Sequence, residues 1–272
     1  MNTLEQIVCK PTPWFALRAT AMLAMFSVFA VLFYIDGTTG YRKKNREFYL
    51  NATFREATAK FSEMNAKGDL TPEMWKDFAE KQNVRLPTDP SLVPADTEMP
   101  LPWPPVLADF SKVKAQQPHL LWQEYSGKNG MSNKVAEHPY DAGKIREQII
   151  VFYICLALAL AALFILIRTS RRSIRADSEA LTTADGRRIP YASLKTLDLR
   201  KWDTKGIALI EFDDPSGSGR ARIDGLTYGG FKREVDQPAE QLMARIRENF
   251  SGEIIEYTTM PEASRPDSSD GD

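Results

Sequence analysis

Five arginines in the C-terminal half of the chain are the residues whose type and spacing could form a binding site. They are Arg171, Arg172, Arg175, Arg187 and Arg188. A guanidinium group binds phosphate and carboxylate oxygens through paired hydrogen bonds, so these positions are candidates for weak contact with anionic lipid headgroups. The alternative is solvated charge in turns, which is the more common origin of short charged runs.

The two groups of arginines have different settings in the sequence. Arg171, Arg172 and Arg175 directly follow an apolar run and fit a collar at an anionic membrane surface. Arg187 and Arg188 lie beside a predicted hairpin, where a phosphate could be held.

The sequence predicts no catalytic residue, cofactor or metal site. His119 and His138 have no cysteine partners, which disfavours zinc, and the two cysteines, Cys9 and Cys155, are too far apart in the sequence to indicate a disulfide framework. No nucleophile–base pair or glycine-rich phosphate loop is visible, so an enzyme is not expected. A formal net charge of -1 gives no support to a nucleic-acid partner.

Two apolar runs predict transmembrane helices. The first, residues 14–35, contains one charge, Arg18, which can reach the headgroups from near a helix end. The second, residues 148–168, is uncharged from Ile149 to Ile167. The alternatives are a cleaved signal peptide for the first run and a buried soluble helix for the second. Four small residues of the second run offer a surface for packing between the two helices. They are Ala157, Ala159, Ala161 and Ala162.

The flanking charges bear on the orientation of these helices. Both termini must lie on one side, and six basic residues flank the runs on each side. Because the loop between the runs is long, its charges count for less, and we predict cytoplasmic termini in a multi-pass protein of the cell (inner or plasma) membrane.

We expect residues 36–147 to form an extracytoplasmic domain that is helical and rich in proline. Gly37 and Gly40 are expected to separate the first transmembrane helix from the next helix. That next helix has an apolar stripe of Leu50, Phe54, Ala57, Phe61 and Met64. Thr71 and Pro72 predict the start of a short helix with Met74, Trp75, Phe78 and Ala79 on one side.

Eight prolines lie between Pro87 and Pro118, and we expect no regular helix there. One interpretation is an extended chain that wraps the domain and is fixed by Leu101, Trp103 and Val106, with Trp122 and Tyr125 in the same small core. The other is a polyproline segment that an aromatic-lined partner binds.

The pattern changes to strands in residues 169–257. Asp185-Gly186 predicts a tight hairpin, and the alternation around Ile210 and Ile223 predicts two half-buried strands joined by an exposed loop over 213–219. A closing helix begins at Asp236 or Gln237, and its apolar face carries Ala239, Leu242, Met243, Ile246 and Phe250. Residues 1–13 are expected to be an N-terminal tail and residues 258–272 a disordered acidic tail.

Part of this region resembles a known family. The run RRIPYASLKTLDLRKWDTKGIALIEF, the later RARIDGLTYGGF and the terminal helix are similar to bacterial pleckstrin-homology-like (PH-like) domains, which are often tethered to transmembrane helices. The resemblance covers about residues 178–250 and is one of pattern, including the turn Trp202-Asp203-x-Lys205-Gly206. It implies a seven-stranded, bent antiparallel barrel capped by a C-terminal helix, and a binding or scaffolding role without a specified ligand.

The predicted fold class is therefore an α+β membrane protein. It has two transmembrane helices, a mainly helical extramembrane loop domain, and a small antiparallel β-barrel capped by one helix. We expect an interaction or scaffolding protein that presents the PH-like domain at the cytosolic membrane surface, with the lipid bilayer, protein partners and anionic headgroups as its partners. The alternatives are an accessory subunit of a transport or envelope-maintenance complex, and a transmembrane sensor that couples the loop domain to the PH-like domain.

Overall fold

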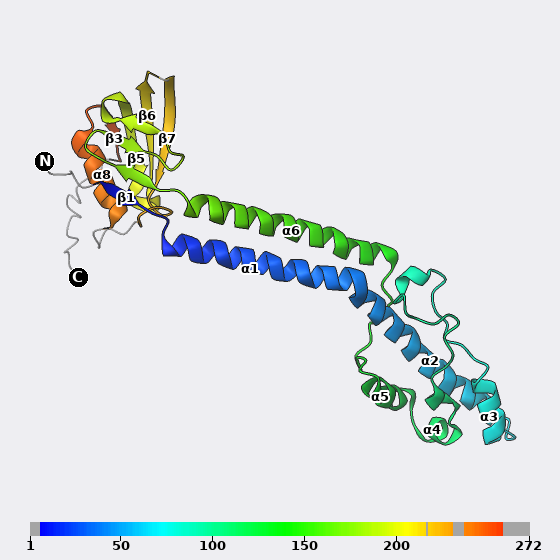
Figure 1. Ribbon diagram of the computed structural model, residues 1–272. Helices are drawn as coiled ribbons and strands as arrows, with labels where there is room; N and C mark the ends of the chain where they lie inside the picture. The colour runs from blue at the N-terminus through cyan, green and yellow to red at the C-terminus, as the bar shows by residue number, and fades with distance from the viewer. Residues whose placement is uncertain (1–5, 216, 231–236, 258–272) are drawn as a thin grey trace, which may run out of the picture. The chain divides into compact units, whose positions relative to one another are not determined.

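The computed structural model describes residues 6–215, 217–230 and 237–257. The chain forms two compact units (Figure 1). We call the unit formed by Met1–Met25 and Ala159–Asp272 the β unit, and the unit formed by Phe26–Leu158 the helical unit. Each unit contains part of both long apolar helices, α1 (Pro13–Ile35) and α6 (Ala142–Ser170).

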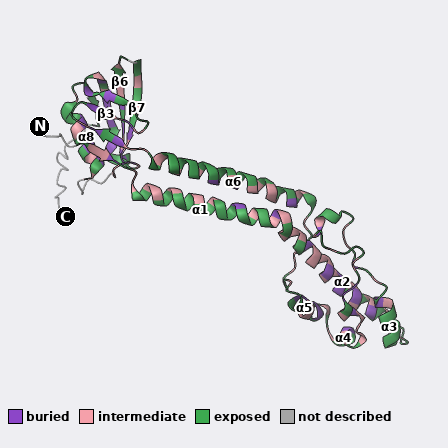
Figure 2. Cartoon of the chain, in the orientation of Figure 1, coloured by how far each residue is buried: buried purple, intermediate pink, exposed green. Residues whose placement is uncertain are grey.

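Both predicted apolar helices are confirmed as helices long and apolar enough to cross a membrane. Only 6% of the most apolar window of the first and 17% of that of the second is buried. Figure 2 shows the same contrast, since α1 and α6 are largely exposed whereas the strands carry many buried residues. Large apolar side chains such as Val31, Leu160 and Phe164 therefore lie on the surface.

Segments of α1 and α6 pack against each other within the helical unit. The rings of Tyr34 and Phe152 lie 5.3 Å apart between centroids. A Cβ added to Gly37 would lie 2.6 Å from Cδ1 of Ile149, so a larger residue there would force the Ile149 side chain to move. The helix continues beyond Gly37.

The predicted break at Gly37 and Gly40 is wrong. Asp36–Gly40 form a π-helical turn (η1), and α2 (Tyr41–Asn65) follows it directly. The glycines allow close packing here and do not end the helix. The π-helical turn contains both of them, and the helical backbone hydrogen bonding continues through it.

Of the four alanines offered as a helix–helix interface, only two are shielded from solvent. Ala159 is buried and Ala162 is half-buried, whereas Ala157 and Ala161 are exposed. Positions three apart share a helix face, but positions two apart do not, so the four alanines could not all face one neighbour.

The helical unit is completed by short helices after α2. They are α3 (Pro72–Ala79), the 3-10 turns η2 (Pro90–Leu92) and η3 (Pro105–Ala108), α4 (Phe110–Ala115) and α5 (Pro118–Lys128). Thr71 caps α3 as predicted, because its hydroxyl accepts a hydrogen bond from the amide of Met74. Met74 itself is exposed, unlike the buried Trp75 and Ala79, so its predicted place on the apolar side is wrong.

Helix α4 contradicts the expectation of no regular helix between Pro87 and Pro118. The side chain of Asp109 accepts a hydrogen bond from the amide of Lys112 and caps the helix. The chain has no proline from 106 to 117, so this stretch is free to form a turn and a half of helix.

Aromatic side chains form the core of the helical unit. The predicted stripe on α2 is buried at Leu50, Phe54, Ala57 and Phe61. Trp75 is fully buried, and its indole N–H donates a 2.9 Å hydrogen bond to the carbonyl of Leu107. Trp103 is 8% exposed, which supports the ordered wrap over an exposed polyproline docking segment.

The β unit contains two four-stranded sheets. The first has the order β1 (Ile7–Cys9), β2 (Ile174–Ala176), β3 (Ala180–Thr182) and β4 (Arg188–Pro190). The second has the order β7 (Gly217–Asp224), β6 (Ile207–Asp214), β5 (Leu194–Lys201) and β8 (Glu253–Ile255). The intervening pieces are η4 (Tyr191–Ser193), α7 (Trp202–Lys205) and α8 (Pro238–Asn249). Both sheets and α8 contribute to one hydrophobic core.

The predicted N-terminal tail is in part a strand. β1 pairs antiparallel with β2, so that Ile7 lies opposite Ala176 and Cys9 opposite Ile174. Cys9 is fully buried, and burial raises the pKa of its thiol to about 12. The amide of Gly229 donates a 2.8 Å hydrogen bond to the carbonyl of Lys10, which joins the segment before α1 to the body of the β unit.

The predicted turn, loop and closing helix of the β unit are all found, with one change of length. The Asp185-Gly186 turn is confirmed, since Gly186 has a φ of 91° between β3 and β4. The predicted loop over 213–219 is shorter, because β6 extends to Asp214 and β7 begins at Gly217. The closing helix is confirmed as α8, with Ala239, Leu242, Met243 and Ile246 buried.

The antiparallel expectation fails for one pair of strands. β8 follows α8 and pairs in parallel with β5. The expected tail over 258–272, and Asp236 as a helix start, lie outside the described residues.

Candidate functional site

Arg187 and Arg188 are both engaged by carboxylates. The guanidinium of Arg187 lies 3.0 Å from Oδ2 of Asp214 and 4.2 Å from the ring centroid of Phe212. Arg188 forms an ion pair of 2.6 Å with Asp177. A phosphate at either position would compete with these carboxylates.

Arg171, Arg172 and Arg175 have a different environment. They follow the end of α6, and within the part of the chain that the structure describes they form no ion pair. Arg175 donates a 3.0 Å hydrogen bond from Nε to the hydroxyl of Ser173. The charges of these arginines are therefore available to an external anion.

Three further basic residues belong to the same region of the β unit. Lys10, Arg18 and Arg168 likewise form no ion pair with any described residue. Arg18 lies 5.9 Å from the ring centroid of Trp14, and Arg168 lies 6.0 Å from that of Phe164. These contacts leave the positive charges unneutralised.

We call this set the basic collar. It consists of Lys10, Arg18, Arg168, Arg171, Arg172 and Arg175. Its two segments, residues 10–18 and 168–175, contain no acidic residue. The β-strand pairing of Ile7–Cys9 with Ile174–Ala176 places the two segments beside each other.

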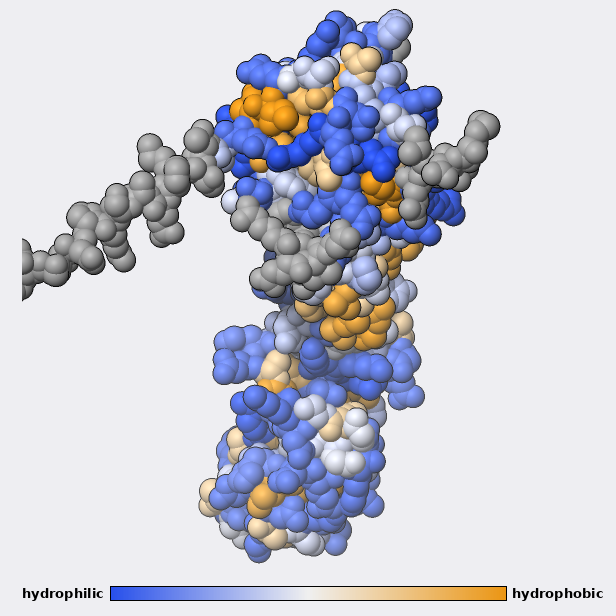
Figure 3. All heavy atoms as spheres, turned by 90° about the vertical axis from the view of Figure 1, so that its left-hand side faces the viewer, coloured by the Kyte–Doolittle hydropathy of each residue, from blue (hydrophilic) through white to orange (hydrophobic). Residues whose placement is uncertain are grey.

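Other arginines among the described residues of the β unit differ from the collar because they are paired with acids. Arg200 lies 2.7 Å from Asp198, and Arg220 lies 2.6 Å from Glu211. The side-chain hydrogen bond from Arg200 is the largest cause that lowers the pKa of Asp198. The face of this unit in Figure 3 is mostly hydrophilic, with separate smaller hydrophobic patches.

Two cavities adjoin the collar within the β unit. The first, of about 320 Å³, is lined mainly by apolar side chains of α1 and α6, including Met22 and Ile165, together with Arg18. The second, of about 260 Å³, is polar and brings together two predicted site residues, Arg172 and Arg187. An apolar cavity with one cation fits an amphipathic molecule, and an arginine-lined cavity fits an anion.

The polar cavity also contains an acidic residue. The hydroxyl of Thr183 donates a hydrogen bond to Asp185, which lowers the pKa of that carboxyl, and the charge of Arg172 acts in the same direction. Arg220 and Arg222 line the cavity as well, and neither was predicted as a site residue. They lie more than 30 residues from Arg187 in sequence, so no local pattern could have associated them.

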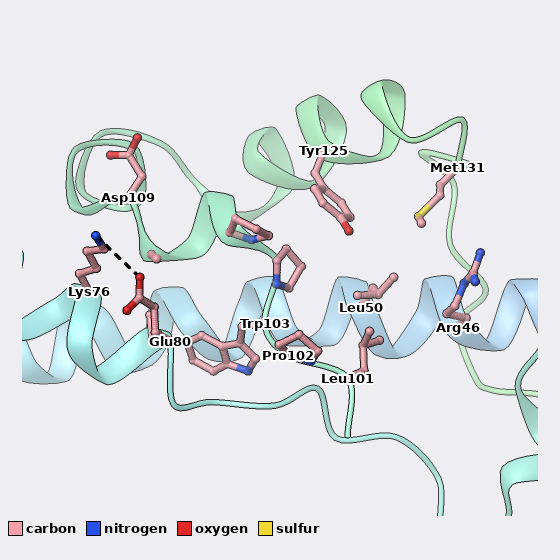
Figure 4. Close-up of a pocket in the computed structure, with 14 residues that line it drawn as sticks. Arg46, Leu50, Lys76, Glu80, Leu101, Pro102, Trp103, Asp109, Tyr125 and Met131 are labelled. Carbon is pink, nitrogen blue, oxygen red and sulfur yellow. Dashed lines mark ion pairs between the residues drawn. The ribbon is translucent and has the colours of Figure 1, made fainter. Parts of the chain in front are cut away.

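A separate groove lies in the helical unit (Figure 4). Its volume is about 750 Å³, and apolar residues such as Leu50, Leu101 and Trp103 form most of its lining. Charged groups lie at its two ends, with Lys76, Glu80 and Asp109 at one and Arg46 at the other. The sequence did not indicate this groove, because its walls come from α2, α3, the proline-rich wrap and α5.

No metal site is evident in the described ranges, where no group of three or more histidine, cysteine or acidic side chains could hold an ion. His119 and His138 lie in different segments of the helical unit. Comparisons of the chain with protein-family models, curated proteins and solved structures found no match.

Proposed function

We propose that the chain is a membrane-anchored interaction and scaffolding protein that acts by binding rather than catalysis. In this proposal α1 and α6 cross a bilayer and hold the β unit at its cytosolic surface. The observation that carries it is a pair of largely exposed apolar helices that meet an unpaired basic collar at the β unit.

The exposure of the helices supports a membrane position. A core helix of a soluble protein is mostly buried, whereas the apolar windows here are 6% and 17% buried. The 23 residues of α1 span about 35 Å, which exceeds the roughly 30 Å hydrocarbon core of a bilayer. Lipid would cover the apolar surface that water otherwise contacts.

The strand before α1 argues against a cleaved signal peptide. Cleavage after α1 would remove β1 and leave the core of the β unit without the fully buried Cys9. It would also break the hydrogen bond from Gly229 to Lys10.

The same strand supports a hairpin of two spans. β1 precedes α1 and β2 follows α6, and the two strands pair. The start of α1 and the end of α6 therefore lie at the same sheet. If both helices cross the bilayer, residues 36–141 must lie on its opposite side.

The charge distribution supports a cytosolic position for the collar. The collar has six basic residues, and its two segments contain no acid. An anionic leaflet attracts each unpaired basic residue near its surface by about 1 kcal/mol.

The PH-like resemblance supports a binding role for the β unit. Two sheets around one core, with α8 packed on that core, are in keeping with part of what the resemblance implies, whereas β1 and the parallel strand β8 depart from a seven-stranded antiparallel barrel. The fold alone does not specify a ligand. The collar supplies the specific chemistry, which is recognition of anionic headgroups beside the anchoring helices.

Lipid selectivity of the full-length chain tests this role. The chain is placed in nanodiscs of equal phosphatidylglycerol and phosphatidylcholine, and the lipids that remain bound after release are counted by native mass spectrometry. Wild type should retain phosphatidylglycerol preferentially. The Arg171→Gln/Arg172→Gln/Arg175→Gln variant should lose preference by up to roughly fivefold per charge, since each is worth about 1 kcal/mol.

A matched variant separates the collar from general charge. Arg188→Gln/Arg200→Gln/Arg247→Gln removes three arginines that are already paired with acids, and it should leave the preference unchanged. Equal losses in the two variants would show an effect of net charge alone. An unchanged preference in the collar variant would refute the proposed headgroup contact.

A further inference from the structure

We propose that the groove of the helical unit binds an extended peptide segment of a partner protein, with a carboxylate of the peptide at Arg46 and its apolar side chains between Leu50 and Trp103. This inference goes beyond the proposed membrane-surface role and does not depend on it. The groove has a volume of about 750 Å³ and lies wholly in the helical unit.

Arg46 has an unmet capacity for hydrogen bonding. Its Nε is buried and has no hydrogen-bond partner. Among the described residues its one ion pair is a 3.9 Å contact with Asp96, whose side chain is 81% exposed. The Arg46 side chain is 27% exposed and lines the groove, so a ligand carboxylate would bind the accessible part of its guanidinium and not the buried Nε.

Tyr125 lines the same groove. Its hydroxyl makes no hydrogen bond to another described residue. Burial raises the pKa of Tyr125, and the charge of Arg46 opposes that rise. A neutral hydroxyl and a guanidinium are both donors, so each can donate a hydrogen bond to an acceptor on a ligand in the groove.

The middle of the groove is apolar. Leu101 and Trp103 come from the proline-rich wrap, and Leu50 comes from α2 (Figure 4). The backbone of the wrap is already used, because the amide of Val84 donates to Leu101 and the amide of Trp103 donates to Gln82. Side-chain contacts, rather than addition of a strand, must therefore hold the ligand.

The end opposite Arg46 favours a peptide over a fatty acid. Lys76 and Glu80 lie 3.8 Å apart there, and Asp109 adds a second carboxylate. The methyl end of a fatty acid would lie against these charges. A peptide can instead place a basic group there, in keeping with the charge complementarity of protein interfaces.

A peptide library tests the proposal on the full-length chain in nanodiscs. The probes are pooled random hexapeptides with free C-terminal carboxylates and the same pool with C-terminal amides. Bound peptides are identified by mass spectrometry. We expect apolar central residues, an acidic group at one end and a basic group at the other, enriched about tenfold over empty nanodiscs.

Variants on α2 identify the site. Arg46→Gln should abolish the enrichment of acidic ends, and Arg46→Lys should keep part of it because the charge remains. Arg55→Gln, an exposed position on the same helix, should behave as wild type. Circular dichroism melting of each variant separates a binding defect from a folding defect.

Three outcomes would overturn the proposal. They are no enrichment over empty nanodiscs, enrichment that Arg46→Gln leaves intact in a folded chain, and displacement of all bound peptides by low dodecanoate concentrations. The last would identify the groove as a fatty-acid site. None of these outcomes would affect the lipid selectivity of the collar variants.

Discussion

Asp177 shows how single side chains stabilise the β unit. Its carboxylate accepts hydrogen bonds of 2.8 and 2.9 Å from the amides of Glu179 and Ala180, and it pairs with Arg188. The hydrogen bond from the amide of Glu179 is the largest cause of its lowered pKa. One carboxylate therefore fixes the turn between β2 and β3.

The lowered pKa of Asp177 predicts a pH dependence of stability. A carboxyl whose folded pKa lies below its unfolded value stabilises the fold above the unfolded pKa, near 4, and loses that contribution as the pH falls through the folded pKa. Asp177→Asn should therefore lower the unfolding temperature of the β unit at pH 7, and the difference from wild type should shrink below pH 4. Thermal unfolding from pH 3 to pH 7 measures this difference.

Glu179→Gln serves as the control for that measurement. The side chain of Glu179 is 82% exposed, so its replacement should change stability little at any pH. A difference between Asp177→Asn and wild type that stays constant across the pH range would contradict the assigned role of the charge.

At the scale of elements, β1 is the part that connects the N-terminal segment to the rest of the β unit. Deletion of residues 2–9 should remove Cys9 from the core and expose the edge of β2. The expected cost is about 2 kcal/mol or more, which corresponds to a fall of roughly 10 °C in the unfolding temperature of a small domain. Differential scanning calorimetry of the full-length chain tests this, with Gln6→Ser as a control outside the strand. An unchanged transition would show that β1 does not contribute.

The elements that could be predicted from the sequence are the long periodic ones. The sequence pattern of apolar residues extends over several turns in four helices, which distinguishes them from strands and loops. They are α1, α2, α6 and α8. β1 and β8 have three residues each, too few to show a period, and β1 pairs with residues far along the chain. The role of Gly37 was ambiguous in the sequence, because a glycine can either end a helix or allow a neighbouring helix to approach closely.

The candidate sites were predictable in part for a related reason. Arg171, Arg172 and Arg175 are adjacent to an apolar run, so their setting was visible in the sequence. The ion pair of Arg187 with Asp214 joins residues 27 positions apart, and its existence required the fold. Arg46 and Tyr125 are further apart still, and only packing of the helical unit brings them to one groove.

At the scale of the whole molecule, the proposed function requires that α1 and α6 place residues 36–141 and the β unit on opposite sides of a membrane. The natural cysteines provide a low background for labelling, since Cys9 and Cys155 are both buried. Single cysteines can be introduced at Ser91 and Ser251, which are exposed positions of the helical unit and the β unit. Wild type, with no added cysteine, is the control.

Labelling with a membrane-impermeant maleimide in intact and permeabilised cells is the most direct test. We expect Ser91→Cys to be labelled in intact cells and Ser251→Cys to be labelled only after permeabilisation. Labelling of both positions in intact cells, or of neither until permeabilisation, would place the two sites on one side and contradict the account.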